Sequence, residues 1–423
     1  MVGLLEHRDA MSAFMSAEHW YVLSALLAPV GFMVQDAVAD AMTVEAVPRV
    51  DEQGRAYDPA TQKAMHTTMQ TLGRVAIIGG TVFVALLNVW FFRDAENLSE
   101  PAKAVLYADV YKYALAIPIV SIAGVVLHSL LKRRHPERLF AQDAKTEPNW
   151  WVLGGSLVFV AVTLAVGLSS VPRAEEIIFA GSCAVILFLL WRLVRELEPR
   201  ARETLVATAL VIFVFRAMPG PGAGATWWMI DVLNFDQSFL ARLSLISSAL
   251  TLAGMFIFRR YMAEKSIAQV IVMLTLVGTV LALPIIGMYD GLHEWTARHT
   301  GGVVDARFIM LVDTAVESPL GQIAMIPMLA WIANSAPGHL KATYFAVMAS
   351  FSNVALSASQ LGTKYLNEIF IVTREVRDQA SGAVKIPADY TELGALLVAS
   401  TVIGFVLPLA AVAVVRAFKL RTA

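Results

Sequence analysis

The chain has 423 residues and a formal net charge of −1; 57% of its residues are hydrophobic and 16% are charged. Soluble domains carry about 25% charged residues, so this composition argues against a soluble domain and places the chain among membrane proteins. A net charge so close to zero gives no support for a nucleic-acid partner. Cys183 is the sole cysteine of the sequence, which excludes an internal disulfide.

Eleven apolar stretches are long enough to cross a bilayer as helices. A span needs about 20 helical residues, because in hydrocarbon every backbone amide must be hydrogen-bonded within its own helix. The chain is therefore predicted to be an all-α membrane protein. The predicted spans lie at 19–42, 72–93, 105–131, 150–170, 174–194, 203–233, 238–260, 267–289, 305–334, 341–368 and 391–416.

Lysine and arginine cluster after the odd-numbered spans. Such clusters follow the third span at 132–145, the fifth at 195–202 and the seventh at 259–265, and another closes the chain at 416–421. Basic loops of membrane proteins stay on the cytoplasmic side. The carboxyl terminus is therefore predicted to be cytoplasmic, with residue 1 on the outer side of the cell (inner) membrane.

Two spans carry the same acidic pattern. Asp36 and Asp40 lie four residues apart in FMVQDAVADAM. Asp313 and Glu317 have the same spacing in IMLVDTAVESP. A spacing of four puts both carboxylates of a pair on one helix face. Two matching pairs indicate duplicated halves, which is the plan of many secondary transporters.

The repeat also predicts how the chain is divided. The last six spans form one complete half, in which the span of Asp313 is the fourth. If the span of Asp36 is the fourth of the other half, that half lacks its first three helices. The spans at 150–170 and 174–194 would then form an extra hairpin between the halves. The predicted parts are a partial amino-terminal half at 1–131, a linker with the hairpin at 132–200 and a complete six-helix half at 201–423.

Four stretches resemble the folate–biopterin transporter family of the major facilitator superfamily. They are QDAVADAMTVEAV, RAMPGPGAGATWWMIDVLNFDQSFLARLSLISSALTLAG, VDTAVESPLGQIAMIPMLAWIANSAPG and LKATYFAVMASFSNVALSASQLG, and they cover most of 31–47 and 215–363. The resemblance implies a major facilitator-like helical bundle and specifies no substrate. The chain departs from the family's pattern in the absent first helices and the extra hairpin. A sister group of photosynthetic-membrane pigment-assembly transporters belongs to the same superfamily, and membership of that group remains an alternative.

The paired acids are candidate proton-binding or substrate-binding groups. Two neighbouring carboxylates in a low-dielectric site cannot both ionise at low cost, so one of them can accept a proton. Asp36 and Asp40 would couple solute movement to a proton gradient, or else pair with basic residues at the cytoplasmic end of their helix. Asp313 and Glu317, with Gln322 further along, would bind solute or proton.

Arg216 and a helix break follow one another in the sixth span. An arginine at membrane depth costs at least about 3 kcal/mol, so Arg216 requires a carboxylate partner or an anionic ligand. We expect it to face one cavity with Asp313 and Glu317. The residues after it cannot continue an ordinary helix, and the break would either line a binding cavity or serve packing. The break comprises Pro219, Gly220, Pro221, Gly222 and Gly224.

Aromatic and amide side chains complete the candidate site. Trp227 and Trp228 would stack on a planar ring such as a pterin, or anchor their helix at the membrane interface. Asn353, with Ser357 and Gln360, lies on one side of the tenth span. These polar groups would bind substrate or form hydrogen bonds between helices.

The leading hypothesis is a proton-coupled secondary transporter of a small organic solute, folate-like or pterin-like, working as a monomer by alternating access. One alternative is a remnant without transport or a membrane assembly factor. A more distant one is a magnesium-dependent, prenyltransferase-like intramembrane enzyme, which would need denser acid clusters than these. The sequence has no Walker loop, HExxH or CxxC motif, so we expect no cofactor and no catalysis.

Overall fold

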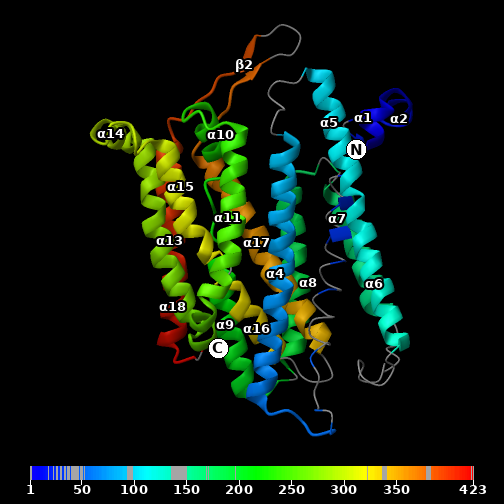
Figure 1. Cartoon of the computed structure of the whole chain (residues 1–423). Helices are drawn as coiled ribbons and strands as arrows, with labels where there is room; N and C mark the ends of the chain where they lie inside the picture. The colour runs from blue at the N-terminus through cyan, green and yellow to red at the C-terminus, as the bar shows by residue number, and fades with distance from the viewer. Residues whose placement is uncertain are drawn as a thin grey trace.

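The computed structural model describes most of the chain as α-helix (Figure 1). The described residues are 2–17, scattered positions between 19 and 51, 53–92, 99–134, 150–167, 169, 171–195, 197–321, 323–335, 341–377, 383–420 and 422. Asp36, Asp40 and Gln322 fall outside them, so the structure does not test these three predicted site residues.

The amino-terminal part contributes short helices and long ones. The described helices are α1 (Val2–Glu6), α2 (Arg8–Phe14), α4 (Pro59–Phe92), α5 (Glu100–Ala114), α6 (Ala116–Arg134), α7 (Trp150–Gly167) and α8 (Ala174–Val194). The apolar side chains of α6 are largely exposed, as for Ile119 and Val120. Helices α5 and α6 therefore form one edge of the bundle (Figure 1).

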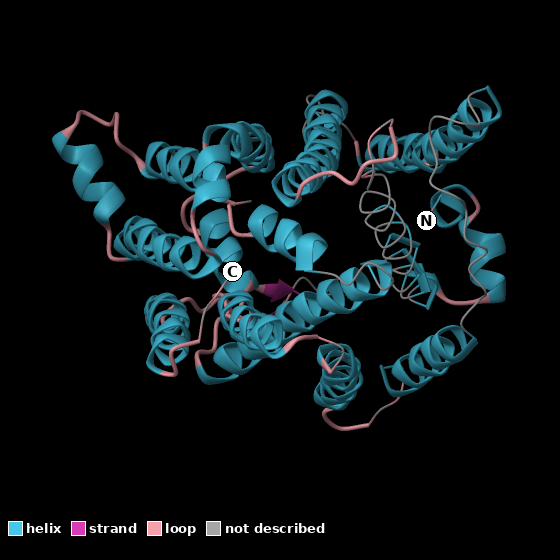
Figure 2. Cartoon of the chain, turned by 90° about the horizontal axis from the view of Figure 1, so that it is seen from below, coloured by secondary structure: helices cyan, strands magenta, loops and turns pink. Residues whose placement is uncertain are grey.

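The carboxy-terminal part contains interrupted helices and a small hairpin. Its elements are α9 (Pro199–Arg216), α10 (Ala223–Asp231), α11 (Gln237–Ile257), α12 (Arg259–Glu264), α13 (Ile267–Tyr289), α14 (Leu292–His299), α15 (Ala306–Glu317), η2 (Ser318–Leu320), α16 (Met325–Ser335), α17 (Lys341–Ile369), β1 (Val376–Arg377), β2 (Val384–Ile386) and α18 (Leu393–Ala417). The two strands pair antiparallel. Seen from below, the amino terminus lies among the helices on one side of the bundle, away from the carboxyl terminus (Figure 2).

Side-chain caps define where several helices begin. The Asp305 carboxylate accepts a hydrogen bond from the amide of Phe308 at the start of α15. Ser266 and Gln269 form a reciprocal capping box at the start of α13. Such caps satisfy amides that the helix itself leaves unpaired.

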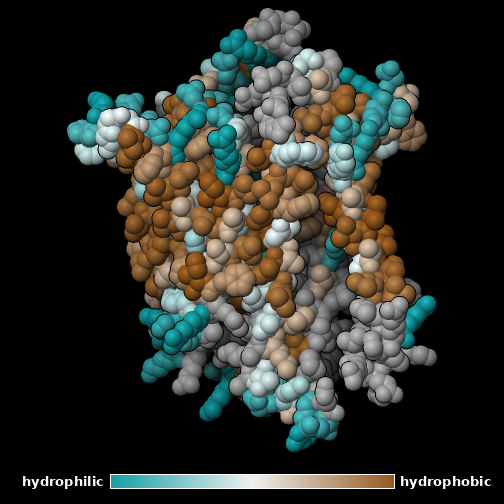
Figure 3. All heavy atoms as spheres, in the orientation of Figure 1, coloured by the Kyte–Doolittle hydropathy of each residue, from teal (hydrophilic) through white to brown (hydrophobic). Residues whose placement is uncertain are grey.

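The length and apolar surface of the described helices are those of an integral membrane protein. On the face of the bundle shown in Figure 3, apolar side chains form a belt, with polar side chains gathered above and below it. Seven described helical segments are long and apolar enough to cross a membrane. They are Thr71–Phe91, Val105–Leu127, Ala174–Val194, Ser238–Ile257, Ile267–Tyr289, Ala306–Leu329 and Leu393–Ala417.

The remaining four predicted spans have different outcomes. Most of 19–42 lies outside the described residues. The stretch 150–170 forms α7, of which Leu157–Gly167 counts as a shorter apolar helix. The stretch 203–233 is split between α9 and α10, and 341–368 forms the more polar α17. The predicted total of eleven spans therefore stays a prediction.

The buried core lies in the carboxy-terminal part. Leu205 and Val211 of α9 are almost fully buried in an apolar cluster with residues of α13, α16, α17 and α18. A second cluster surrounds Trp228 and Met288, with residues of α15, α17 and α18, at the end of the bundle opposite the carboxyl terminus, which is called the outer end below. Helix α9 is thus a central element of the bundle.

Helix α8 is fastened to this carboxy-terminal part. Its residues Glu175 and Glu176 each lie 3.1 Å from the Nζ atom of Lys364 on α17. The Tyr365 hydroxyl donates to Glu176. At the other end of α8, Leu193 joins the core around α9. The predicted hairpin therefore packs through α8 directly against α17.

Candidate functional site

Asp313 is the most deeply buried acid of the predicted site. It lies in α15 with 4% of its surface exposed, and neither carboxylate oxygen has a hydrogen-bond partner in the described structure. Glu317, one helical turn further on, is exposed. A buried carboxylate without a partner is costly in its charged form, because burial removes its hydration. Chemically, such a carboxyl group can accept a proton, or can bind a ligand that supplies the missing hydrogen bonds.

The helix of Asp313 is interrupted directly below it. The predicted span at 305–334 corresponds to the candidate span Ala306–Leu329, but it is not one continuous α-helix, because α15 ends at Glu317, η2 follows, and α16 begins at Met325. Pro319 in this segment cannot donate a backbone hydrogen bond, which explains the interruption. The interrupted segment is bound to α11. The Ser318 hydroxyl lies 2.9 Å from that of Ser247, and the Thr251 hydroxyl donates to the Ser318 carbonyl at 2.9 Å.

The predicted break after Arg216 is present as a non-helical segment between α9 and α10. It carries Pro219, Gly220, Pro221 and Gly222, and Gly222 has a φ of +73°, which favours glycine. Gly224 does not belong to the break. It lies in the first turn of α10, where an added Cβ atom would be 2.8 Å from the side chain of Val372. Close packing thus accounts for this glycine.

Backbone groups of the break form hydrogen bonds with α17. The Ser359 hydroxyl donates to the Met218 carbonyl at 2.6 Å, and the Gly220 amide donates to the Thr363 hydroxyl at 3.0 Å. Asn367 reaches the Pro221 carbonyl at 3.4 Å. Of the two functions expected for the break, these contacts favour helix packing over an open cavity lining.

The polar stripe of α17 that contacts the break differs from the one predicted. Asn353 and Gln360 are exposed, and Ser357 donates only to the carbonyl of Asn353 within its own helix. The stripe that contacts the break comprises Ser359, Thr363 and Asn367. Their spacing of four residues is visible in the sequence, but their hydrogen bonds to the break are not.

Replacing Thr363 by valine should destabilise the protein, because it removes a hydrogen bond between α17 and the break. The Gly220 amide would lose its acceptor, and an unsatisfied, partly buried amide costs about 1–3 kcal/mol. The melting temperature in detergent should therefore fall. Ser357→Ala is the matched control, because that hydroxyl contacts only its own helix. An equal fall in both variants would contradict the assigned role of Thr363.

Arg216 has no carboxylate partner among the described residues. Its guanidinium Nε donates to the Ser352 carbonyl at 3.4 Å, and its Nη1 lies 3.7 Å from the sulfur of Met325. Neither Asp313 nor Glu317 forms an ion pair with it in the described structure. Arg216 thus lies between α16 and α17, and the expected salt bridge with these acids is not formed.

The two tryptophans of α10 have different environments. Trp228 is buried in the outer apolar cluster, with its ring centroid 6.0 Å from that of Tyr289. It is therefore a core residue in this conformation and is not available to stack on a ligand. Trp227 is half-buried. None of the predicted site residues lines the cavity of about 680 Å³ between α13 and α18.

A charged contact that the sequence did not reveal closes the outer end of α10. Arg374 donates two hydrogen bonds to the Asp231 carboxylate, at 2.8 and 3.0 Å. The Tyr390 hydroxyl donates to the same carboxylate at 2.6 Å. Tyr289 donates in turn to the backbone carbonyls of Tyr390 and Thr391. The segment between α17 and α18 is thereby fixed to α10 and α13.

Alkaline pH should weaken this outer contact. Burial, and then the hydrogen bond to Asp231, raise the pKa of Tyr390 from 10.0 to about 12. The fold thus favours the neutral phenol, so its stabilisation is complete below pH 10 and is lost as the pH rises from 10 to about 12. The melting temperatures of the parent protein and of Tyr390→Phe are measured between pH 10 and 12. The parent protein should be the more stable of the two at pH 10, and this difference should disappear as the pH rises. A constant difference between the two proteins would contradict the assignment.

Comparison with known proteins identifies related sequences. Residues 142–419 match the BT1 family. A folate-biopterin transporter of Synechocystis sp. (strain ATCC 27184 / PCC 6803 / Kazusa) is 25% identical over 263 residues, which cover 56% of this chain and 51% of that relative. The chain thus spans about half the length of the curated relative it matches. No solved structure matches the chain. The family match includes α7 and α8, which the sequence pattern had set apart as an extra hairpin.

Proposed function

The chain belongs to the BT1 family, and from this membership and the buried Asp313 we propose that it is a secondary transporter of a small organic solute. The relative's name points to a folate-like or pterin-like solute. The observation that carries the proposal is a carboxylate 4% exposed in a membrane-spanning helix with both oxygens unpartnered. Carboxylates at membrane depth mark ion and substrate pathways.

Asp313 would couple transport to protons. In the observed conformation its carboxyl group is surrounded by protein, where the neutral form is favoured. A conformation that opened α15 to water would favour the charged form and release the proton. Glu317, exposed on the same helix, would exchange protons between solvent and Asp313. Alternating access supplies the two environments that this mechanism requires.

Arg216 would bind the anionic part of the solute. It is half-buried, and among the described residues its hydrogen bonds go to neutral groups, the Ser352 carbonyl and the Met325 sulfur. A guanidinium can bind a carboxylate through two parallel hydrogen bonds. Folate carries carboxylates, whereas an unmodified pterin ring does not. Arg216→Ala should therefore weaken the binding of folate more than that of a neutral pterin.

The proposed arrangement follows the sequence repeat. The segment 201–423 would be one complete half, 1–131 part of the other, and 132–200 the linker with its hairpin. The protein would act as a monomer in the cell (inner) membrane, with its carboxyl terminus in the cytoplasm. No catalysis is part of this proposal.

Uptake into proteoliposomes tests the proposal. We expect the full chain to accumulate labelled folate or pterin when a proton gradient is imposed, and a protonophore to abolish this accumulation. Accumulation that persists with the protonophore would exclude proton coupling. Binding without any flux would favour the alternative of a membrane assembly factor.

A further inference from the structure

Helix α14 leaves the bundle sideways at its outer end. It connects α13 to α15 and projects away from both of them (Figure 1). Gly291 before the helix and Gly301 and Gly302 after it all have positive φ angles, of +85°, +63° and +88°. Glycine adopts positive φ angles at low cost because it has no Cβ atom. They allow the chain to turn out of α13 and to return into α15.

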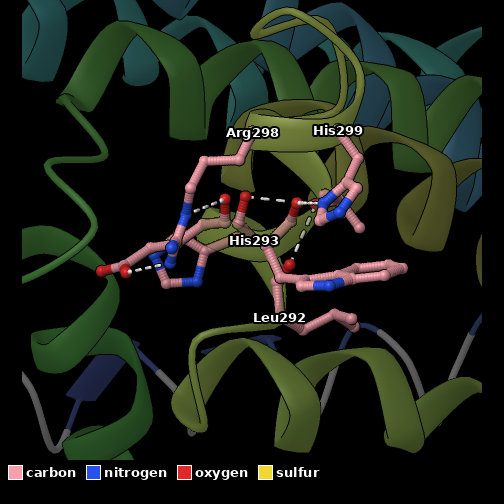
Figure 4. Close-up of polar contacts among 7 residues, drawn as sticks. Leu292, His293, Arg298 and His299 are labelled. Atoms are coloured by element: carbon pink, nitrogen blue, oxygen red, sulfur yellow. Dashed lines mark hydrogen bonds and ion pairs between the residues drawn. The ribbon is translucent and has the colours of Figure 1, made fainter.

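Helix α14 has two faces, and Figure 4 shows the polar contacts of Arg298 and His299 on it. On one face, Trp295 is 57% exposed and its ring centroid lies 4.6 Å from that of His299. Leu292 begins this face and packs against α13. On the other face, the exposed side chains of Glu294 and Arg298 form an ion pair at 3.4 Å. The helix is thus amphipathic, with a large exposed aromatic residue.

The position of α14 matches the boundary of the membrane. The preceding span ends at Tyr289, three residues before α14, and the following span begins at Ala306. In the space-filling view, α14 lies at the upper edge of the apolar belt (Figure 3). Amphipathic helices with an exposed tryptophan on one face and charged residues on the other lie in this zone of a bilayer.

Hydrogen bonds join α14 to the loop that leads into α15. The Thr296 hydroxyl donates to the Val304 carbonyl at 2.7 Å, and the Gly302 amide donates to the Ala297 carbonyl at 2.8 Å. The Val304 amide donates to the Thr300 hydroxyl at 2.9 Å. A contact that fixes the depth of α14 would therefore also fix the depth of the outer end of α15.

We propose that α14 is a lipid-binding helix that lies in the headgroup region of the outer leaflet. Trp295 and Leu292 enter the acyl boundary beneath the phosphates. Arg298, beside its ion-pair partner Glu294, lies on the opposite face at the level of the phosphates, to which a cationic guanidinium is complementary. The bound bilayer surface thereby holds α15, and with it Asp313, at a constant depth. This inference does not depend on the solute or on proton coupling.

Spin labels test the depth of each face in the full chain. Cys183→Ser removes the native cysteine, and single cysteines then replace Glu294, Trp295 or Arg298. The proteins are placed in nanodiscs of phosphatidylcholine and phosphatidylglycerol, and collisions with oxygen and a nickel chelate are measured. The label at 295 should lie about 5–10 Å below the phosphates, whereas the labels at 294 and 298 should be accessible to nickel. Equal nickel access at all three positions would overturn the proposal.

A second measurement retains the native helix. Tryptophan fluorescence is recorded in nanodiscs that contain brominated phosphatidylcholine, for the parent protein and for Trp295→Phe. The difference between the two spectra reports Trp295, and we expect this component to be strongly quenched by the brominated lipid. Absence of quenching would mean that water or protein covers the ring, and would overturn the proposal even if a cysteine variant failed to fold.

Discussion

Replacing Asp313 by asparagine is expected to abolish proton-driven accumulation while leaving the fold at least as stable. The amide has nearly the same shape as the carboxyl group but cannot bind and release a proton at physiological pH. In the parent protein the carboxylate is buried without a hydrogen-bond partner, so the substitution removes a group that is costly to bury in its charged form. Proteoliposome uptake and the melting temperature in detergent are measured on the same preparation. Exchange of solute without a gradient should be less affected than accumulation.

Two other acids serve as controls for Asp313. Asp290 is exposed at the end of α13, so Asp290→Asn should retain accumulation. Glu317→Gln should slow accumulation without a gain in stability, because that carboxylate is already exposed. If Asp313→Asn still accumulates solute against a gradient, Asp313 does not couple transport to protons. A large loss of stability would instead show that the carboxylate has a structural role.

Hydropathy predicts the long and uniformly apolar helices well. The predicted stretches 267–289 and 391–416 correspond closely to α13 (Ile267–Tyr289) and α18 (Leu393–Ala417). Each tolerates a proline, Pro284 or Pro408, because the surrounding helix remains continuous. A hydropathy window averages over such local features. For the same reason it gives 305–334 as one span and does not show its division into α15, η2 and α16, although Pro319 and Gly321 lie in the stretch.

Those features of the candidate site that lie within one helix were predictable from the sequence, whereas contacts between helices were not. The sequence places Asp313 and Glu317 in one apolar helix, but it does not show that Asp313 is buried and Glu317 exposed. The partners of the break on α17 depend on which helices pack together, and so do the neutral contacts of Arg216. The contact of Asp231 with Arg374 joins residues 143 positions apart. No local pattern can reveal such a pair.

The structure describes one of the two acid pairs of the predicted repeat, so the repeat stays a prediction. Asp313 and Glu317 lie on one helix in different environments, so the pair does not act as two equivalent carboxylates. Asp36 and Asp40 lie outside the described residues, and their proposed role in coupling stays a prediction. Matched asparagine substitutions at Asp36 and Asp313 would show whether the two halves share one mechanism.

Replacing Gly254 by alanine is expected to destabilise the protein strongly. Gly254 lies in α11, where an added Cβ atom would be 2.7 Å from the carbonyl carbon of Pro319 and in still closer contact with the carbonyl oxygen. Atoms of the backbone cannot move aside as the end of a side chain can. Overpacking of this kind costs about 1–3 kcal/mol or more. The melting temperature should fall markedly, and solute binding should weaken because α11 holds η2 next to the helix of Asp313.

Gly278 provides the matched control for Gly254. It also lies inside a membrane-spanning helix, α13, but no atom lies within 4 Å of an added Cβ there. Alanine in a helix interior is favoured over glycine by roughly 0.5–1 kcal/mol, so Gly278→Ala should leave the melting temperature unchanged or raise it. Equal melting temperatures for the two variants would mean that α11 and η2 are not in close contact. Lost binding at an unchanged melting temperature in Gly254→Ala would instead assign the contact to function rather than to folding.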